Sequence, residues 1–224
     1  MDEVKNMTYQ KIESQDDYLK IVEYYKDYEA GTYESMTLKE KMEFFNGIHT
    51  DNIPLFDEDG DDMDTADDYY SIRDEFLDHP EQFSLSDILT FLEMLDDSCY
   101  QPSFMDTITV IIHNIVRHYQ LEGVVFLLSH LHEVSKKAYE FGWFVNIRLL
   151  IKDDITYQLM KDAIGLVTLD TVRLIHRIVS GKDLLELVEK DGKVNEFLIF
   201  DECGDETEVK RKQELENIIL SLLD

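Results

Sequence analysis

From residue 84 to its end, the chain carries a succession of apolar segments with helical spacing, and this pattern limits its possible folds most strongly. Apolar side chains recur every three or four residues, which places them on one face of an α-helix. The segments are joined by short connections, and each is long enough for roughly 11–18 residues of helix. They read SLSDILTFLEMLDD, PSFMDTITVIIHNIVRHYQ, LEGVVFLLSHLHEV, KKAYEFGWFVNIRLLI, DITYQLMKDAIGLV and LDTVRLIHRIV.

Pairs of these helices repeat along the chain, with hairpins starting near residues 86, 122 and 154, a spacing of 32–36 residues. Such spacing is typical of helix pairs that stack and bury their apolar faces on their neighbours. The chain also has only 3 prolines and 9 glycines, which favours helices over a strand-rich fold. We therefore predict a mainly all-α protein of stacked antiparallel helix hairpins that resembles a short HEAT-like solenoid.

The N-terminal region, residues 1–80, has weaker apolar periodicity, with helices predicted at about 15–29, 38–46 and 65–78 and a loop over 50–64. Thr37 and Glu40 have the spacing of a capping box, which marks the start of the second helix. We expect this region to form one continuous domain with the stacked-helix region, residues 84–224. In the latter we predict an amphipathic helix from Glu208 and another at about 183–190, with a possible small hairpin near 185–201 that turns at Asp191.

Charge is extreme and unevenly distributed. The chain has 21 Lys and Arg against 49 Asp and Glu, a net charge of −28, and residues 1–100 hold 28 of the acids but only 7 of the bases. No basic stripe exists to contact phosphates, so we expect neither nucleic acid nor an anionic membrane as a partner. The N-terminus lacks the features of a signal peptide, and Cys99 and Cys203 cannot form a disulfide framework, so we predict a cytoplasmic protein.

The densest acidic stretch lies at residues 51–68, where nine of eighteen side chains are Asp or Glu and none is Lys or Arg. An EF-hand calcium loop needs glycine at position 6 and oxygen ligands at positions 1, 9 and 12. Placing Gly60 at position 6 puts Leu55, Met63 and Ala66 at those three positions. A specific calcium site is therefore disfavoured, and the stretch is either a solvated loop or a surface for a cationic partner.

No signature of catalysis or of a cofactor site is found in the sequence. On a helix, His113 and His118 lie about 140° apart and His130 and His132 about 200° apart, so neither pair can chelate one ion. Glycine-rich phosphate loops and nucleophile elbows are missing. We predict no enzyme activity, no cofactor and no metal.

Aromatic residues accompany the acids in the first third of the chain, where tyrosine is frequent. Carboxylates bind guanidinium groups in two-point hydrogen bonds, and tyrosine rings accept their flat faces. These residue types together indicate a surface that receives Lys and Arg of another protein. The predicted partner-binding residues are Asp57, Glu58, Asp59, Asp61, Asp62, Asp64, Asp67, Asp68, Tyr69 and Tyr70.

Residues 139–154, YEFGWFVNIRLLIKDD, place Glu140, Trp143 and Arg148 on one late helix. Together with the acidic, stacked-helix layout, this pattern resembles the helical-repeat immunity proteins of bacterial polymorphic toxin and contact-dependent growth inhibition systems. The resemblance covers about residues 84–165 and excludes the acidic N-terminal third. We expect these three residues to serve packing and ion pairing rather than toxin contact.

The resemblance implies a cytoplasmic protein that binds a cognate toxin domain and blocks it, and many such toxins are nucleases with basic surfaces. An acidic inhibitor suits such a partner because long-range attraction speeds its capture. Two other functions stay open from the sequence. One is a helical-repeat scaffold or adaptor that binds a cellular protein, and the other is a weak cation-binding regulator.

Overall fold

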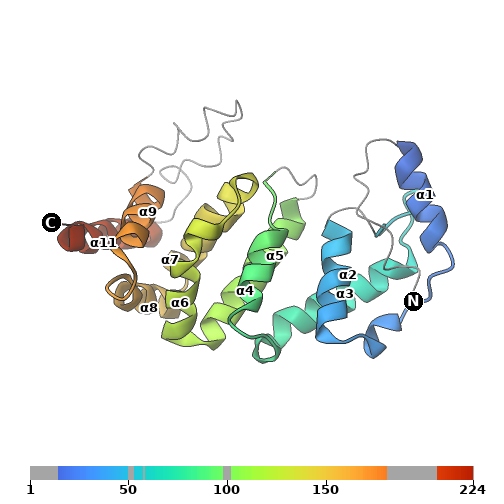
Figure 1. Cartoon of the computed structure of the whole chain (residues 1–224), viewed down its shortest axis with the longest axis horizontal. Coiled ribbons are helices and arrows are strands. Elements are labelled where there is room, and N and C mark those ends of the chain that lie inside the picture. The colour runs from blue at the N-terminus through green and yellow to red at the C-terminus, as the bar shows by residue number, and fades with distance from the viewer. Residues whose placement is uncertain (1–14, 50–52, 58, 98–101, 181–205, 224) are drawn as a thin grey trace. The chain divides into compact units, whose positions relative to one another are not determined.

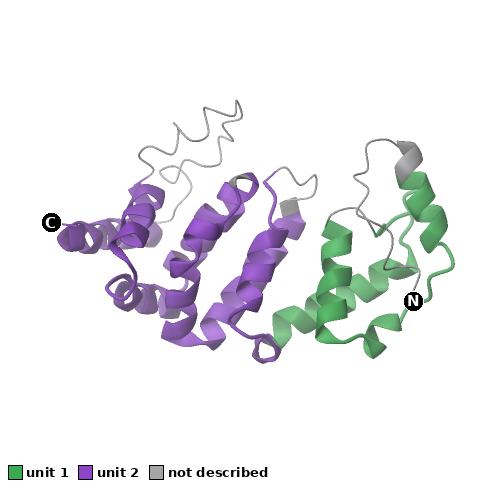
Figure 2. Ribbon diagram, in the orientation of Figure 1, with its two compact units in different colours: residues 1–79 green, residues 80–224 purple. Residues whose placement is uncertain are grey.

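The structure is a computed structural model, and it describes residues 15–49, 53–57, 59–97, 102–180 and 206–223. Within these ranges most of the chain is helical and none of it forms a strand, and the only β-type pairing is an isolated bridge between Phe56 and Asp62. The all-α prediction is therefore confirmed, whereas the solenoid stacking stays a prediction. The chain divides into two compact units, residues 1–79 and residues 80–224 (Figure 2).

Unit 1 consists of α1 (Gln15–Tyr25), the 3-10 helix η2 (Thr32–Ser35), α2 (Leu38–His49) and α3 (Asp64–Asp78) (Figure 1). Its core lies between α2 and α3, where Phe45 and Tyr69 stack with ring centroids 5.3 Å apart. Ile72 and Phe76 extend this core by one and two turns of α3, and both are fully buried. The predicted capping box is present, because Thr37 N–H donates to the Glu40 carboxylate at 2.9 Å.

Unit 2 begins with η3 (Pro80–Gln82), α4 (Asp87–Met94), α5 (Pro102–His118) and α6 (Gln120–Ser129). Two 3-10 turns, η4 (Leu131–Glu133) and η5 (Lys136–Ala138), lead into a π-helix, η6 (Glu140–Val145), and then α7 (Asn146–Lys152). The described part ends with α8 (Asp154–Ile164), α9 (Leu169–Ser180) and α11 (Glu206–Leu223). Successive helices pack side by side, α4 on α5, α5 on α6 and α6 on α8 (Figure 1).

Most predicted helices are found within a few residues of their expected bounds, but the segment KKAYEFGWFVNIRLLI is not one regular helix. The side chain of Asn146 donates to the Phe141 carbonyl at 2.7 Å, five residues earlier, which suits the wider π-helical turn. Asp97 caps the start of this turn, because its two carboxylate oxygens accept the N–H groups of Glu140 at 2.9 Å and Phe141 at 3.2 Å. Burial raises the pKa of the Asp97 carboxyl to about 6, against the opposing effect of these two donors.

The predicted C-terminal helix is present as α11 and begins at Glu206. Its inner face packs on α9, and Leu215 and Ile219 are fully buried there. The helix predicted at 183–190 and the hairpin predicted near 185–201 lie outside the described residues. None of the described helices is long and apolar enough to cross a bilayer.

The close contact between α5 and α6 depends on Gly123. A Cβ atom at this position would lie 2.9 Å from the Cα atom of Val116, which is backbone and cannot move away as a side chain could. We expect Gly123→Ala to lower the free energy of unfolding of unit 2 by about 1–2 kcal/mol through overpacking.

Gly165 provides the matched control for this substitution. A Cβ there would meet nothing within 4 Å, and its backbone is right-handed, with φ of −73°. Gly165→Ala should therefore leave stability unchanged or raise it slightly. Urea unfolding followed by the fluorescence of the single tryptophan measures both variants, and equal stabilities would contradict the proposed close packing.

Candidate partner-binding surface

The acidic stretch folds into a short, hydrogen-bonded loop before α3. Its two sides are joined by backbone bonds from Asp57 N–H to Asp61 O and from Met63 N–H to Leu55 O, both 2.9 Å long. The turn is closed by Gly60 N–H, which donates to Asp57 O at 3.2 Å. Gly60 has φ of +86°, a left-handed conformation that glycine adopts without strain. Backbone hydrogen bonds therefore join the described residues on the two sides of the turn.

Asp57 organises the loop from inside rather than offering its carboxylate outward. Its Oδ1 atom accepts the N–H groups of Asp59 and Asp61, each at 2.9 Å. These two bonds occupy one oxygen of the Asp57 carboxylate within the loop. Among the described residues, no group of three or more His, Cys, Asp or Glu side chains is arranged to hold a metal ion.

Five of the acidic residues predicted to bind a partner have exposed side chains. They are Asp59, Asp61, Asp62, Asp64 and Asp67, which we call the acidic surface. Two of them, Asp64 and Asp67, lie in the first turn of α3, where a negative charge also stabilises the helix dipole. The side chains of the other three have no hydrogen-bond or ion-pair partner among the described residues. These three carboxylates therefore have no visible role inside the fold.

Two of the predicted contact residues, Asp68 and Tyr69, lie in the interior of unit 1, each with 1% of its surface exposed. Tyr69 stacks on Phe45 in the core, so its ring is not available to a partner. The Asp68 carboxylate accepts the Tyr28 hydroxyl and Gly31 N–H, both at 2.6 Å, and Tyr33 N–H at 3.1 Å. Both residues hold the fold together, and this corrects their placement on the binding surface.

Helical periodicity explains why these two residues are buried. Thr65, Asp68, Tyr69, Ile72 and Phe76 recur at intervals of three or four, so they share the face of α3 that packs inward. This helical spacing is present in the sequence, whereas the density of carboxylates alone does not distinguish the inward face of α3 from the outward one. Glu58, the remaining acid of the prediction, lies outside the described residues.

Tyr70 is 39% exposed, and its ring already carries a cation of its own chain. The Arg73 guanidinium carbon lies 4.9 Å from the centroid of the Tyr70 ring, and the same guanidinium pairs with Asp74 at 2.7 Å. The Tyr70 ring therefore stacks with an arginine as predicted, but this arginine belongs to the same chain and not to a partner.

The segment between α1 and η2 brings one further acid, Glu29, close to the start of α3, and the sequence did not predict this. Ala30 N–H donates to the Asp64 carboxylate at 3.4 Å, and Gly31 N–H donates to Asp68, so residues 30–31 lie against the first turns of α3. Glu29, directly before them, is exposed. Because more than thirty residues separate Glu29 from Asp64, no local spacing in the sequence predicts their proximity.

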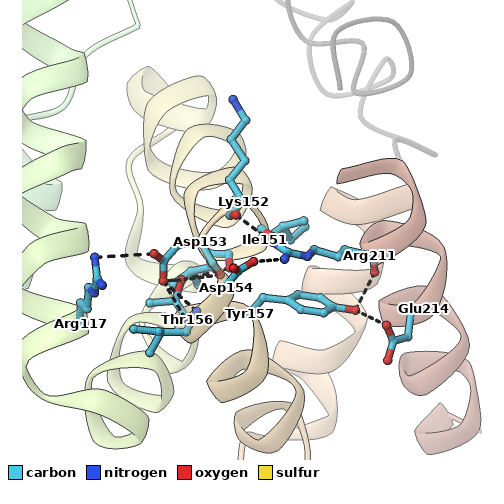
Figure 3. A network of polar contacts seen from close by, with 11 residues as sticks. Arg117, Ile151, Lys152, Asp153, Asp154, Thr156, Tyr157, Arg211 and Glu214 are labelled. Carbon is cyan, nitrogen blue, oxygen red and sulfur yellow. Dashed lines mark hydrogen bonds and ion pairs between the residues drawn. The ribbon is translucent and has the colours of Figure 1, made fainter. Parts of the chain in front are cut away.

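Unit 2 contains a second group of charged residues, which ties α11 to α7 and α8 (Figure 3). Arg211 donates to the carbonyls of Ile151 at 2.9 Å and Lys152 at 2.7 Å, and it pairs with Asp154. Tyr157 donates its hydroxyl to Glu214 at 2.8 Å. Burial, and then the bond to Glu214, raise the pKa of Tyr157 well above its ordinary value, so this hydroxyl stays protonated near neutral pH.

At the other end of this group, Asp153 is the N-cap of α8 and accepts the N–H groups of Ile155 and Thr156. Burial opposes its ionisation, but the Thr156 donors and the charge of Arg117 outweigh burial and hold its pKa below the usual value. A carboxylate and a phenol with pKa values shifted in these directions do not exchange protons near pH 7. We therefore infer that this group of charged residues has a structural role, which is to hold α11 against α7 and α8.

Two residues of the immunity-protein pattern also have structural roles in unit 2. Trp143 is 7% exposed and donates its Nε1–H to the Leu131 carbonyl at 2.8 Å. Arg148 pairs with the buried Glu208 of α11 at 2.7 Å. Packing and ion pairing, as expected for them, are confirmed. The acidic surface thus remains the strongest candidate for partner contact.

In comparisons with models of protein families, with curated proteins and with solved structures, nothing matches the chain.

Proposed function

We propose that this protein is a cytoplasmic immunity protein, without enzyme activity, that binds and neutralises a cognate basic toxin such as a nuclease. The observation that carries the proposal is the set of exposed carboxylates of Asp59, Asp61 and Asp62 on a hydrogen-bonded loop. They lack internal partners among the described residues, and mutual repulsion makes their proximity unfavourable for the isolated fold. A cationic partner removes that repulsion.

The loop geometry favours tight binding because little order remains to be imposed. Backbone bonds between Leu55 and Met63 and between Asp57 and Asp61, together with the Asp57 carboxylate, already hold the described residues of the loop, so association has less order to impose on them. Exposed carboxylates near the rim of an interface act chiefly on the association rate. An inhibitor that must reach a toxin before the toxin reaches its substrate gains most from that effect.

Charge reversal of the loop should abolish neutralisation. We expect Asp59→Lys/Asp61→Lys/Asp62→Lys to lose co-purification with the cognate basic toxin, and to lose protection of cells that express this toxin. The fold should be retained, because the three side chains make no hydrogen bond or ion pair with any described residue.

The matched control has the same change in net charge at exposed acids of unit 2, Glu122→Lys/Asp162→Lys/Glu206→Lys. It should keep both co-purification and protection. Equal losses in the two triple variants would show that overall charge, and not the acidic surface, governs binding. Full protection by the loop variant would contradict the proposed function.

A further inference from the structure

A pocket of about 310 Å³ lies in unit 2 between η4, the π-helix and α9. It is separate from the acidic surface, which belongs to unit 1, and from the contacts that attach α11. Its volume is at the lower end of the range for pockets that hold small ligands. It combines apolar side chains with basic ones.

The apolar part of the pocket is built from Val134, Trp143 and Leu174, each less than 10% exposed. The Tyr139 ring stacks on the Trp143 indole, with centroids 4.0 Å apart and ring planes at 18°. Because the indole N–H already donates to Leu131, the tryptophan offers only ring surface to the pocket. These side chains therefore suit a flat, apolar group.

The basic part of the pocket comes from α9 and η4. Arg173 and Arg177 are exposed and lie one turn apart on α9, and His132 stands on η4. Arg173 pairs with Asp170 at 2.7 Å. Arg177 and His132, in contrast, have no side-chain hydrogen bond or ion pair with any described residue. In a chain with a net charge of −28, a guanidinium group without such a partner beside an apolar pocket indicates an anionic ligand.

We propose that this pocket binds a small organic anion whose flat, apolar body packs on Trp143, Val134 and Leu174 and whose charged group is held by Arg177. Carboxylate and phosphate share the geometry that a guanidinium fork recognises, so the ligand is an aromatic carboxylate or a phosphate monoester that carries an aromatic ring. Asp170 stands at the same rim and neutralises Arg173, which leaves Arg177 as the principal anchor. The net charge of −28 repels polyanions, so a small anion suits the pocket better than a nucleic acid does.

Trp143 allows a direct test because it is the only tryptophan, so its indole N–H gives a single side-chain signal in a ¹H–¹⁵N spectrum. The probes are benzoate, its neutral isostere benzamide, adenosine monophosphate and inorganic phosphate, each titrated into the full chain. We expect saturable shifts of the indole signal with benzoate or adenosine monophosphate. Benzamide and inorganic phosphate should bind about tenfold more weakly, because each lacks one of the two recognised features.

Arg177→Gln should weaken binding of the anionic probe about tenfold and leave benzamide unaffected. Lys152→Gln, which removes an exposed cation elsewhere in unit 2, is the control and should bind like the wild type. Saturation by benzoate alone assigns a carboxylate, and saturation by adenosine monophosphate alone assigns a phosphate ester. The proposal is overturned if neither anion saturates the signal below about 10 mM, or if Arg177→Gln binds as well as the wild type.

Discussion

Replacing Asp68 by alanine should lower the free energy of unfolding of unit 1 by about 3–5 kcal/mol. The carboxylate is buried and accepts three hydrogen bonds from the chain between α1 and η2, from Tyr28, Gly31 and Tyr33. Its removal leaves two backbone N–H groups and a hydroxyl without their acceptor, and it removes three of the hydrogen bonds that join residues 28–33 to α3. A loss of this size is a large part of the total stability of a small unit.

The neighbouring substitution Asp67→Ala is the matched control, because Asp67 is exposed on the same turn of α3. It should change stability by less than about 0.5 kcal/mol. Hydrogen exchange of peptides from residues 28–33 and 64–78 separates unit 1 from unit 2, which contains the only tryptophan. The protection of these peptides in Asp68→Asn, which keeps one oxygen acceptor, should lie between that of Asp68→Ala and that of Asp67→Ala. Equal protection in all three variants would contradict the structural role of Asp68.

Acid should destabilise unit 1 through His49, and His49→Leu should remove that sensitivity. His49 is the last residue of α2, is 7% exposed and has its ring centroid 4.5 Å from that of Phe45. Burial lowers the pKa of His49 from 6.5 to about 3. Between these two values the unfolded chain binds a proton that the folded chain does not, so stability falls as pH falls. At pH 5 the loss amounts to about 2 kcal/mol relative to pH 7.5.

The measurement is the free energy of unfolding of unit 1 at pH 7.5 and pH 5.0 for the wild type and for His49→Leu. The loss of stability between pH 7.5 and pH 5.0 should be about 2 kcal/mol smaller for the variant than for the wild type. Carboxylates contribute the same pH dependence to both proteins, so their contribution cancels when the two losses are compared. His132→Gln, at an exposed histidine, should retain the full wild-type dependence. An unchanged dependence in His49→Leu would show that the histidine is not held neutral in the fold.

The sequence predicted the helices well because apolar periodicity is a local property of the chain. It did not predict the π-helix at Glu140–Val145, because Asn146 and Asp97 reshape that turn through contacts that periodicity does not record. Asp97 lies more than forty residues from the turn that it caps. A cap contributed from so far away leaves no trace in the local spacing.

The binding surface was predicted only in part, for a related reason. The composition of residues 57–70 indicates negative charge, but it does not say which carboxylates face solvent. Asp67 and Asp68 are adjacent and chemically identical, yet one is exposed and the other accepts hydrogen bonds from residues 28–33. Asp68 is buried and Asp67 is exposed for two reasons: they lie on different faces of α3, and a distant segment, residues 28–33, contacts Asp68. Only the first reason can be read from the sequence.

If the acidic surface speeds the capture of a basic protein, the rate of association must depend strongly on the salt concentration. Stopped-flow association with the cognate basic toxin should slow by one to three orders of magnitude as ionic strength rises from about 0.02 M to about 0.5 M. The variant Asp59→Lys/Asp61→Lys/Asp62→Lys should lose this dependence, whereas Glu122→Lys/Asp162→Lys/Glu206→Lys should keep most of it. A wild-type rate that does not change with salt, or a loop variant with the wild-type dependence, would contradict this role of the acidic surface.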